Sequence, residues 1–278
     1  MTEHKIAVRE ETALDRPAIH LSATIANILI NQSPLHAWTA HRGLNPDYQE
    51  EEAKNLDFGT IAHALMLEGA HIAEVLDFPD YRKDKAKEAR DLARAAGKVP
   101  ILKKDYENVV LMVEAGKLQL SEYPDVFPTP GTPERRITWK EDGVDCKAIL
   151  DYVSDSLKVI TDYKTRNGSA NPDVISRTIF SEGWDIKAAF YIRAVKSIDS
   201  NVDPAFYYVC QETYPPYALS VNSLAPDALM IGEKKVMYAL EKWRECMESG
   251  VWPGYPTDVC FATLPPWEES KWLEKELR

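Results

Sequence analysis

Apolar residues recur with helical spacing through the first third of the chain. The longest such stretch, Leu56–Leu76, predicts a long and largely buried helix. Two shorter helices are predicted ahead of it, one over residues 21–30 with Ser22 as its cap and one beginning at Pro34, because Pro suits the first helical position. A charged, Ala-rich segment and an amphipathic segment follow at residues 84–97 and 101–121.

The pattern changes at Pro124–Pro133, a stretch with four prolines and one glycine. Beyond it, runs of β-branched and aromatic residues flank Glu141-Asp142-Gly143, which predicts a hairpin because Gly tolerates the positive φ of a tight turn. The predicted strands cover residues 135–140, 144–153, 157–163, 205–212 and 217–221. The helices predicted among them cover residues 171–182, 184–198 and 224–249, the last ended by Gly250, and a short helix after Pro266 is expected to dock on the body.

This order of elements predicts an α/β fold in a single domain over residues 1–278. Residues 1–123 form its mainly helical N-terminal part, and residues 134–278 form the part with the sheet. Neither GxGxxG nor GxxxxGK[ST] occurs, so the sequence offers no Gly-rich loop for a dinucleotide or for P-loop chemistry.

Composition indicates a folded protein outside the membrane. Apolar residues make up 45% of the chain, with 7 Trp and 13 Tyr, whereas disordered chains are poor in aromatics. The longest apolar runs fall far short of the roughly 20 residues that span a bilayer, and no signal-type segment follows Met1. A cytoplasmic location is the expectation. The 4 cysteines form no CxxC pair, so reduced and mostly buried thiols are expected.

The net charge of −11 argues against a protein whose whole surface grips DNA. An enzyme that encloses DNA needs positive potential only along its track, however, and carboxylates that hold metal ions add to the negative total.

The most informative chemistry lies on two successive predicted strands. Asp151 interrupts an apolar run, and Asp162 and Lys164 end the next strand on one face, since side chains alternate along a strand. The turn between the strands can bring Asp151 beside Asp162. Carboxylate oxygens and the carbonyl of Tyr163 suit Mg²⁺, while Lys164 can orient or deprotonate a water that attacks phosphorus. The plainer alternative is a solvated strand end with a simple salt bridge.

These residues occur within a longer ordered set that resembles the PD-(D/E)xK nuclease superfamily, particularly its RecB-like and RecE (exodeoxyribonuclease VIII) branches. The branches have Gly-x-x-x-His on a helix, Asp on one strand, Asp-x-Lys on the next and Gln-x-x-x-Tyr on a following helix. This chain has Gly59-Thr-Ile-Ala-His63. It continues with Asp151, Asp162-Tyr-Lys164 and Lys187-Ala-Ala-Phe-Tyr191. Lys187 departs from the family Gln.

The resemblance implies a restriction-endonuclease-like core, a central mixed sheet flanked by helices. It implies that His63 binds or adjoins a metal ion, Mg²⁺ with Mn²⁺ as a substitute, and that Glu134 supplies a further carboxylate. The alternatives are a buried helix histidine satisfied by a carbonyl for His63 and a surface charge for Glu134. Glu68 lies five residues after His63, off its helical face, so a supporting role is expected. DNA contacts are expected from Tyr191, Lys187, Arg166 and Ser22, with solvated surface charge as the alternative for Arg166.

The function implied is a 5′→3′ exodeoxyribonuclease that degrades one strand of linear double-stranded DNA in recombination, as in phage systems. The resemblance also implies transfer of the other strand to a RecT-type annealing protein and a homo-oligomeric ring around DNA. Two alternatives stay open: a RecB-like or CRISPR-adaptation nuclease of the same fold, and a non-catalytic DNA-end-binding protein. The latter is expected to lack Asp162 or Lys164, which this chain retains.

Overall fold

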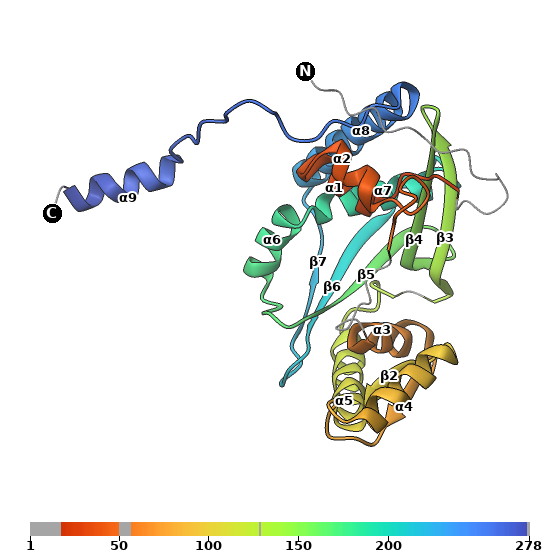
Figure 1. The fold of residues 1–278 in the computed structure, drawn as a ribbon. Coiled ribbons are helices and arrows are strands. Elements are labelled where there is room, and N and C mark those ends of the chain that lie inside the picture. The colour runs from red at the N-terminus through yellow and green to blue at the C-terminus, as the bar shows by residue number, and fades with distance from the viewer. Residues whose placement is uncertain (1–17, 50–56, 128, 277–278) are drawn as a thin grey trace.

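A five-stranded mixed sheet organises the protein. The computed structural model describes residues 18–49, 57–127 and 129–276. The strands lie in the order β3-β4-β5-β6-β7, and only the central pair β5–β6 is parallel (Figure 1). Their bounds are β3 Gly131–Glu141, β4 Val144–Ser154, β5 Val159–Arg166, β6 Ala205–Glu212 and β7 Leu219–Asn222. The predicted α/β fold with a mixed sheet flanked by helices is confirmed.

The hairpin between β3 and β4 forms where the sequence predicts it. Asp142 and Gly143 both have positive φ, 49° and 85°, and Glu141 pairs with Val144 across the turn. This is the backbone of a two-residue type I′ turn, whose twist matches that of the strands. The hairpin fixes the register of β4, and with it the position of Asp151.

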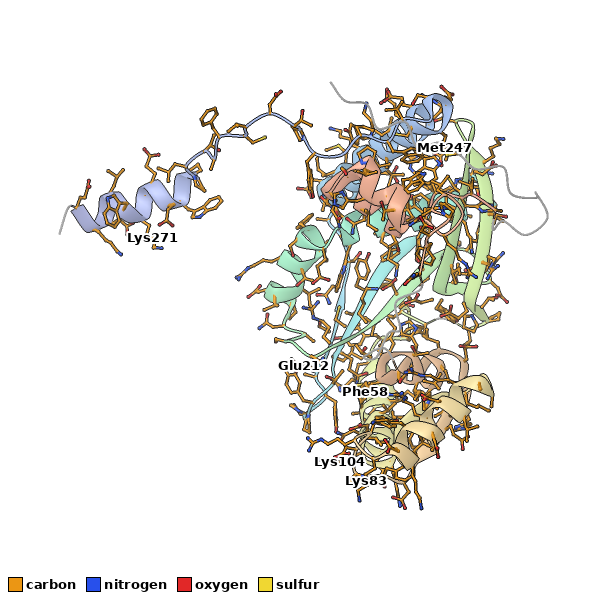
Figure 2. The ribbon with its side chains drawn as sticks, in the orientation of Figure 1. Phe58, Lys83, Lys104, Glu212, Met247 and Lys271 are labelled. Carbon is orange, nitrogen blue, oxygen red and sulfur yellow. The ribbon has the colours of Figure 1, made fainter. Side chains whose placement is uncertain are left out.

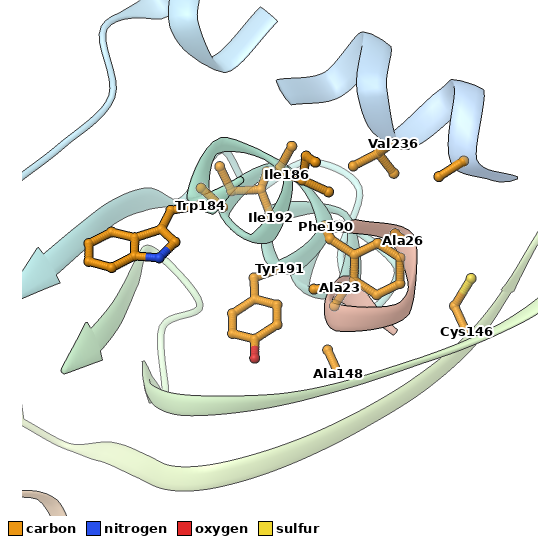
Figure 3. Packing of buried hydrophobic residues seen from close by; sticks show 14 of the residues in the cluster. Ala23, Ala26, Cys146, Ala148, Trp184, Ile186, Phe190, Tyr191, Ile192 and Val236 are labelled. Atoms are coloured by element: carbon orange, nitrogen blue, oxygen red, sulfur yellow. The ribbon is translucent and has the colours of Figure 1, made fainter. Parts of the chain in front are cut away.

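One face of the sheet is covered by helices from both ends of the sequence. Helices α1 (Ala23–Asn31), α7 (Trp184–Lys196) and α8 (Pro226–Ser249) pack together there, with α2 (Pro34–Ala40) beside them and α6 (Pro172–Ser181) near β7 (Figure 1). Leu21, just ahead of α1, forms a parallel bridge with Cys146 of β4. The core on this face of the sheet includes Ala23, Ala26, Cys146, Ala148, Phe190 and Val236 (Figure 3).

The opposite face of β5 and β6 meets a helical cap. Successive side chains of a strand point to opposite faces of the sheet. Phe206 and Tyr208 of β6 therefore lie in the core beneath α1, α7 and α8, whereas Val209 packs against the cap. The cap consists of α3 (Asp57–His63), η1 (Ala64–Glu68), β1 (Ala73–Leu76), α4 (Asp84–Ala95), β2 (Val99–Leu102) and α5 (Lys103–Leu120). Phe58 lies on its side next to the sheet, and Lys83 and Lys104 lie at its far end (Figure 2).

The long helix predicted over Leu56–Leu76, of which Leu56 lies outside the described residues, is wrong beyond Glu68. Helix α3 continues as a π-helix only to Glu68, and Gly69 ends it in the left-handed region at φ 63°. Ala73–Leu76 instead form strand β1, which pairs in parallel with β2. The pairing partner lies more than twenty residues away in sequence, so helical spacing alone could not reveal it.

The C-terminal helix α9 (Pro266–Glu276) forms as predicted, but it does not dock on the body. None of its described residues is buried, and Trp267 and Trp272 are 72% and 60% exposed. The helix and Lys271 on it stand clear of the remainder of the chain (Figure 2). The two Trp are five residues apart, about 140° around an α-helix, so they form no common apolar face. Among the described residues, no helix combines the length and apolar character that a membrane crossing needs.

Candidate active site

The site forms where β4 and β5 stop pairing. The two strands pair only at Tyr152–Thr161 and Val153–Ile160, and this register, continued by one residue, places Asp151 opposite Asp162. Beyond that point the ladder is replaced by a side chain: the N–H of Tyr163 donates to Asp151 Oδ2 at 3.0 Å. The expected approach of Asp151 to Asp162 is therefore observed.

Helix α3 positions His63 next to Asp151 and Tyr163. Its Nε2 lies 2.6 Å from the carbonyl oxygen of Tyr163 and 3.5 Å from Asp151 Oδ2. Gly59, one turn earlier, makes this approach feasible because a Cβ there would already lie 3.3 Å from Thr165 Oγ1 on β5. The Gly-x-x-x-His spacing thus has a local reason: the glycine lets the helix lie close to the strand, and the histidine reaches over it.

Glu134 completes a group with metal-binding chemistry. It lies on β3 between the paired residues Pro133 and Arg135, and their register with β4 places it across from Asp151. Its φ of 47° is unusual for a residue with a side chain, and such backbone strain is concentrated at functional sites. Its Oε1 is 3.9 Å from His63 Nδ1.

One ligand atom from each of His63, Glu134 and Asp151 lies within 4.8 Å of the others, the only such three-residue group found among the described residues. Two carboxylates and an imidazole, with the Tyr163 carbonyl beside them, are a donor set that fits a divalent cation. Asp162, an expected ligand, is not part of this group.

Asp162 instead lies between two ammonium groups. It is fully buried, Lys164 Nζ contacts its Oδ1, and Lys187 Nζ contacts its Oδ2 from helix α7. Burial alone would raise the pKa of Asp162, but the two lysines outweigh it and hold the pKa below its ordinary value.

Asp151 behaves in the opposite way. Burial, and then the neighbouring charge of Asp162, raise the pKa of Asp151 to about 6, against the smaller opposing effects of Lys187, Lys164 and His63. The pKa values of these two carboxyls on adjacent strands thus shift in opposite directions, because only Asp162 has ammonium groups in direct contact.

The residues expected to contact DNA lie in different environments. Lys187 points at Asp162, and Tyr191 lies beneath it with its ring centroid 5.1 Å from Nζ and only 7% exposed. Arg166 stacks over Trp184 at 5.5 Å. Ser22 caps α1, its hydroxyl accepting from the N–H of Ile25 at 3.3 Å. DNA contact by any of them stays a prediction.

Two hollows open on either side of Lys164 and Thr165, which line both. The larger, about 570 Å³, contains His63, Glu134 and Glu68 in its wall, and the smaller, about 320 Å³, contains Arg166 and Trp184. Glu68 reaches this wall because residues 64–68 form a π-helix, whereas α-helical spacing places it away from His63.

Sequence reasoning missed a buried amide that supports Tyr163. Gln211 on β6 is fully buried, its Oε1 accepts from the hydroxyl of Tyr163 at 2.6 Å, and its Nε2 donates to the Met112 carbonyl of α5 at 2.7 Å. The signal available in the sequence was a Gln that directly follows the apolar run 205–210 within the predicted strand. The bond ties the cap to the strand that carries the site.

Comparisons with known proteins agree with this fold. A family model described as "PDDEXK-like domain of unknown function (DUF3799)" matches residues 29–263. A crystal structure from Eubacterium rectale named "Putative exonuclease" matches with a TM-score of 0.59 and 11% identity, covering 90% of this chain and 92% of that one. The structure of SSO0001 covers 76% of this chain and 100% of its own at 10% identity, but its TM-score is only 0.28. No curated protein matches the sequence.

Proposed function

The chain belongs to the PDDEXK-like DUF3799 family, and on this premise we propose that it is a metal-dependent exonuclease that degrades one strand of linear double-stranded DNA. One observation supports this above the others: Asp151, Asp162 and Lys164 converge beside His63 and Glu134, and Lys164, His63 and Glu134 line one hollow. Three carboxylates, an imidazole and an ammonium group suit the hydrolysis of a phosphodiester.

The cation is proposed to be Mg²⁺, with Mn²⁺ as a substitute. His63, Glu134 and Asp151 would hold it, together with the carbonyl of Tyr163, and Asp162 would adjoin it. When bound, it offsets the negative charge that develops on the phosphate.

The protein's own groups supply positioning and proton transfer. Lys164, held at Asp162 Oδ1 and lining both hollows, is proposed to orient the attacking water or take its proton. Arg166, in the wall of the smaller hollow, is proposed to bind a backbone phosphate, since a guanidinium suits phosphate oxygens. Tyr191 supports Lys187 from below, and Ser22 marks the N-terminus of α1 as a further phosphate contact.

The finer assignment rests on the resemblance to RecE-type enzymes. We propose 5′→3′ polarity, a role in recombination of phage type in the cytoplasm, a RecT-type annealing protein as partner and a homo-oligomeric ring. A ring would reconcile the net charge of −11 with a locally basic channel, because only the inner surface needs to attract DNA.

The test is digestion of end-labelled linear duplex and of closed circular duplex, with Mg²⁺ and with EDTA. Asp162→Ala removes the buried carboxylate, and Glu248→Ala, on the exposed surface of α8, is the charge-matched control. Wild type and the control are expected to shorten only the linear substrate and only with metal. Equal cutting of circular DNA would refute exonuclease action, and wild-type digestion by Asp162→Ala would refute the site.

A further inference from the structure

Lys187 holds an unusual position for a lysine. It comes from the first turn of α7, and its ammonium group contacts the fully buried Asp162 and lies over the ring of Tyr191. Its side chain is only 25% exposed. The charge is therefore directed at a carboxylate of the site and not outward to solvent.

The candidate metal ligands and Lys187 come from different elements of the fold. The group formed by His63, Glu134 and Asp151 draws on α3, β3 and β4, and it excludes Asp162. Asp162 has one oxygen committed to Lys164 and the other to Lys187. A second divalent cation bound to Asp162 would have to displace one of these ammonium groups.

The net charge of the site also disfavours a second divalent cation. Glu134, Asp151 and Asp162 provide three negative charges, and Lys164 and Lys187 two positive ones, which leaves a net charge of −1 when His63 is neutral. One divalent cation brings this cluster to +1, but two would bring it to +3 in a partly buried space. Two-metal sites need carboxylates free to bridge ions about 3.5–4 Å apart, and Asp162 is not free.

We propose that Lys187 acts as a tethered cation in place of a second metal ion, so that each chain binds one divalent cation. The proposal rests on the proposed metal-dependent function and concerns how many ions that function uses. Lys187 is a positioning residue here: it holds Asp162 and supplies fixed positive charge to the side of the site that faces α7. A Gln at position 187 would supply hydrogen bonds without that charge.

The experiment counts bound ions without any DNA. Metal-free protein is titrated with Mn²⁺, and the free ion is followed by its electron paramagnetic resonance signal, for wild type, Lys187→Gln and Lys187→Arg. We expect one Mn²⁺ per chain for wild type and for Lys187→Arg, which keeps the positive charge. Lys187→Gln is expected to bind two, and adding Asp162→Asn to it should return the count to one.

Each outcome has a separate meaning. Two ions on wild type, or one on folded Lys187→Gln, would overturn the role of Lys187 while leaving a metal-dependent nuclease intact. No ion on wild type would refute the metal-dependent function itself. Circular dichroism establishes that each variant is folded, and two ions on wild type would overturn the proposal even if Lys187→Gln does not fold.

Discussion

The carboxylate of Asp151 accepts the backbone N–H of Tyr163 at 3.0 Å, in the place where a ladder hydrogen bond between β4 and β5 would otherwise continue. The carbonyl oxygen of Tyr163 lies 2.6 Å from His63 Nε2. The N–H and the carbonyl of Tyr163 lie where β4 and β5 no longer pair, and both are contacted by side chains of the candidate site. The candidate site therefore lies at the point where β4 and β5 separate.

The first prediction concerns Asp151→Asn in metal-free protein. Burial and Asp162 raise the pKa of Asp151 to about 6, above its ordinary value of 3.8. A carboxyl whose folded pKa is raised binds protons more tightly in the folded state, so the wild type loses stability as pH rises from about 4 to about 6. Asn keeps the oxygen that accepts from Tyr163 and has no charge to bury. We expect the variant to exceed wild type by on the order of 1–3 kcal/mol at pH 8.

Urea denaturation in EDTA at pH 5 and pH 8 measures this difference, which should shrink at the lower pH. Mn²⁺ affinity of the same variant should fall at least tenfold, because even loss of a group that only supports a metal ligand costs about 10–100-fold. A wild type more stable than Asp151→Asn at pH 8 would contradict the assigned electrostatics.

Local sequence patterns predicted the elements that carry the site. The strand over residues 205–212 agrees at both ends with β6, and the Asp-Gly turn sets the β3–β4 register. Once that register exists, the short turn after Ser154 places Asp151 across from Asp162. These features follow from neighbours in sequence, so strand alternation and turn chemistry suffice to predict them.

What the sequence could not predict depends on contacts between distant segments. The end of the helix at Glu68 depends on β1 pairing with β2, and the burial of Gln211 depends on α5 lying against β6. Lys187 was expected to face DNA, and it points at Asp162 because α7 packs against that face of the sheet. No spacing rule within one segment encodes such packing.

A second prediction separates strain from metal binding at Glu134. With φ at 47°, glycine fits this backbone without penalty, whereas any side chain costs about 1–2 kcal/mol. We expect Glu134→Gly to be more stable than Glu134→Ala by about 1 kcal/mol, after the greater freedom of glycine in the unfolded chain is subtracted. Both variants should lose Mn²⁺ affinity equally, because both lack the carboxylate. Calorimetric melting and Mn²⁺ titration of the pair provide the measurements, and unequal affinities would argue against Glu134 as a ligand.

A third prediction separates the backbone of Tyr163 from its side chain. Tyr163→Phe leaves the carbonyl and N–H in place but deprives the buried Gln211 Oε1 of its donor. We expect a loss of stability of about 1–3 kcal/mol. Nuclease activity below the melting temperature should stay within about twofold, because the site uses only main-chain groups of this residue. Tyr238→Phe, at a 49% exposed tyrosine of α8, is the control and should change neither quantity. A large loss of activity in folded Tyr163→Phe would show that the hydroxyl itself takes part.

The last prediction tests how closely α3 must lie against β5. A Cβ at position 59 would lie 3.3 Å from Thr165 Oγ1, so the larger side chain of Gly59→Val must push the helix away from the strand. His63, one turn further on, would then be displaced from Asp151 and Tyr163. We expect a loss of stability of about 1–3 kcal/mol, typical of overpacking, together with weaker Mn²⁺ binding. Thr165→Ala removes the atom that clashes, so the double variant should recover part of both losses. The two single variants and the double variant form a double-mutant cycle, measured by urea denaturation and Mn²⁺ titration. If the two substitutions show zero coupling in both stability and Mn²⁺ affinity, Gly59 does not set the position of His63 through this contact.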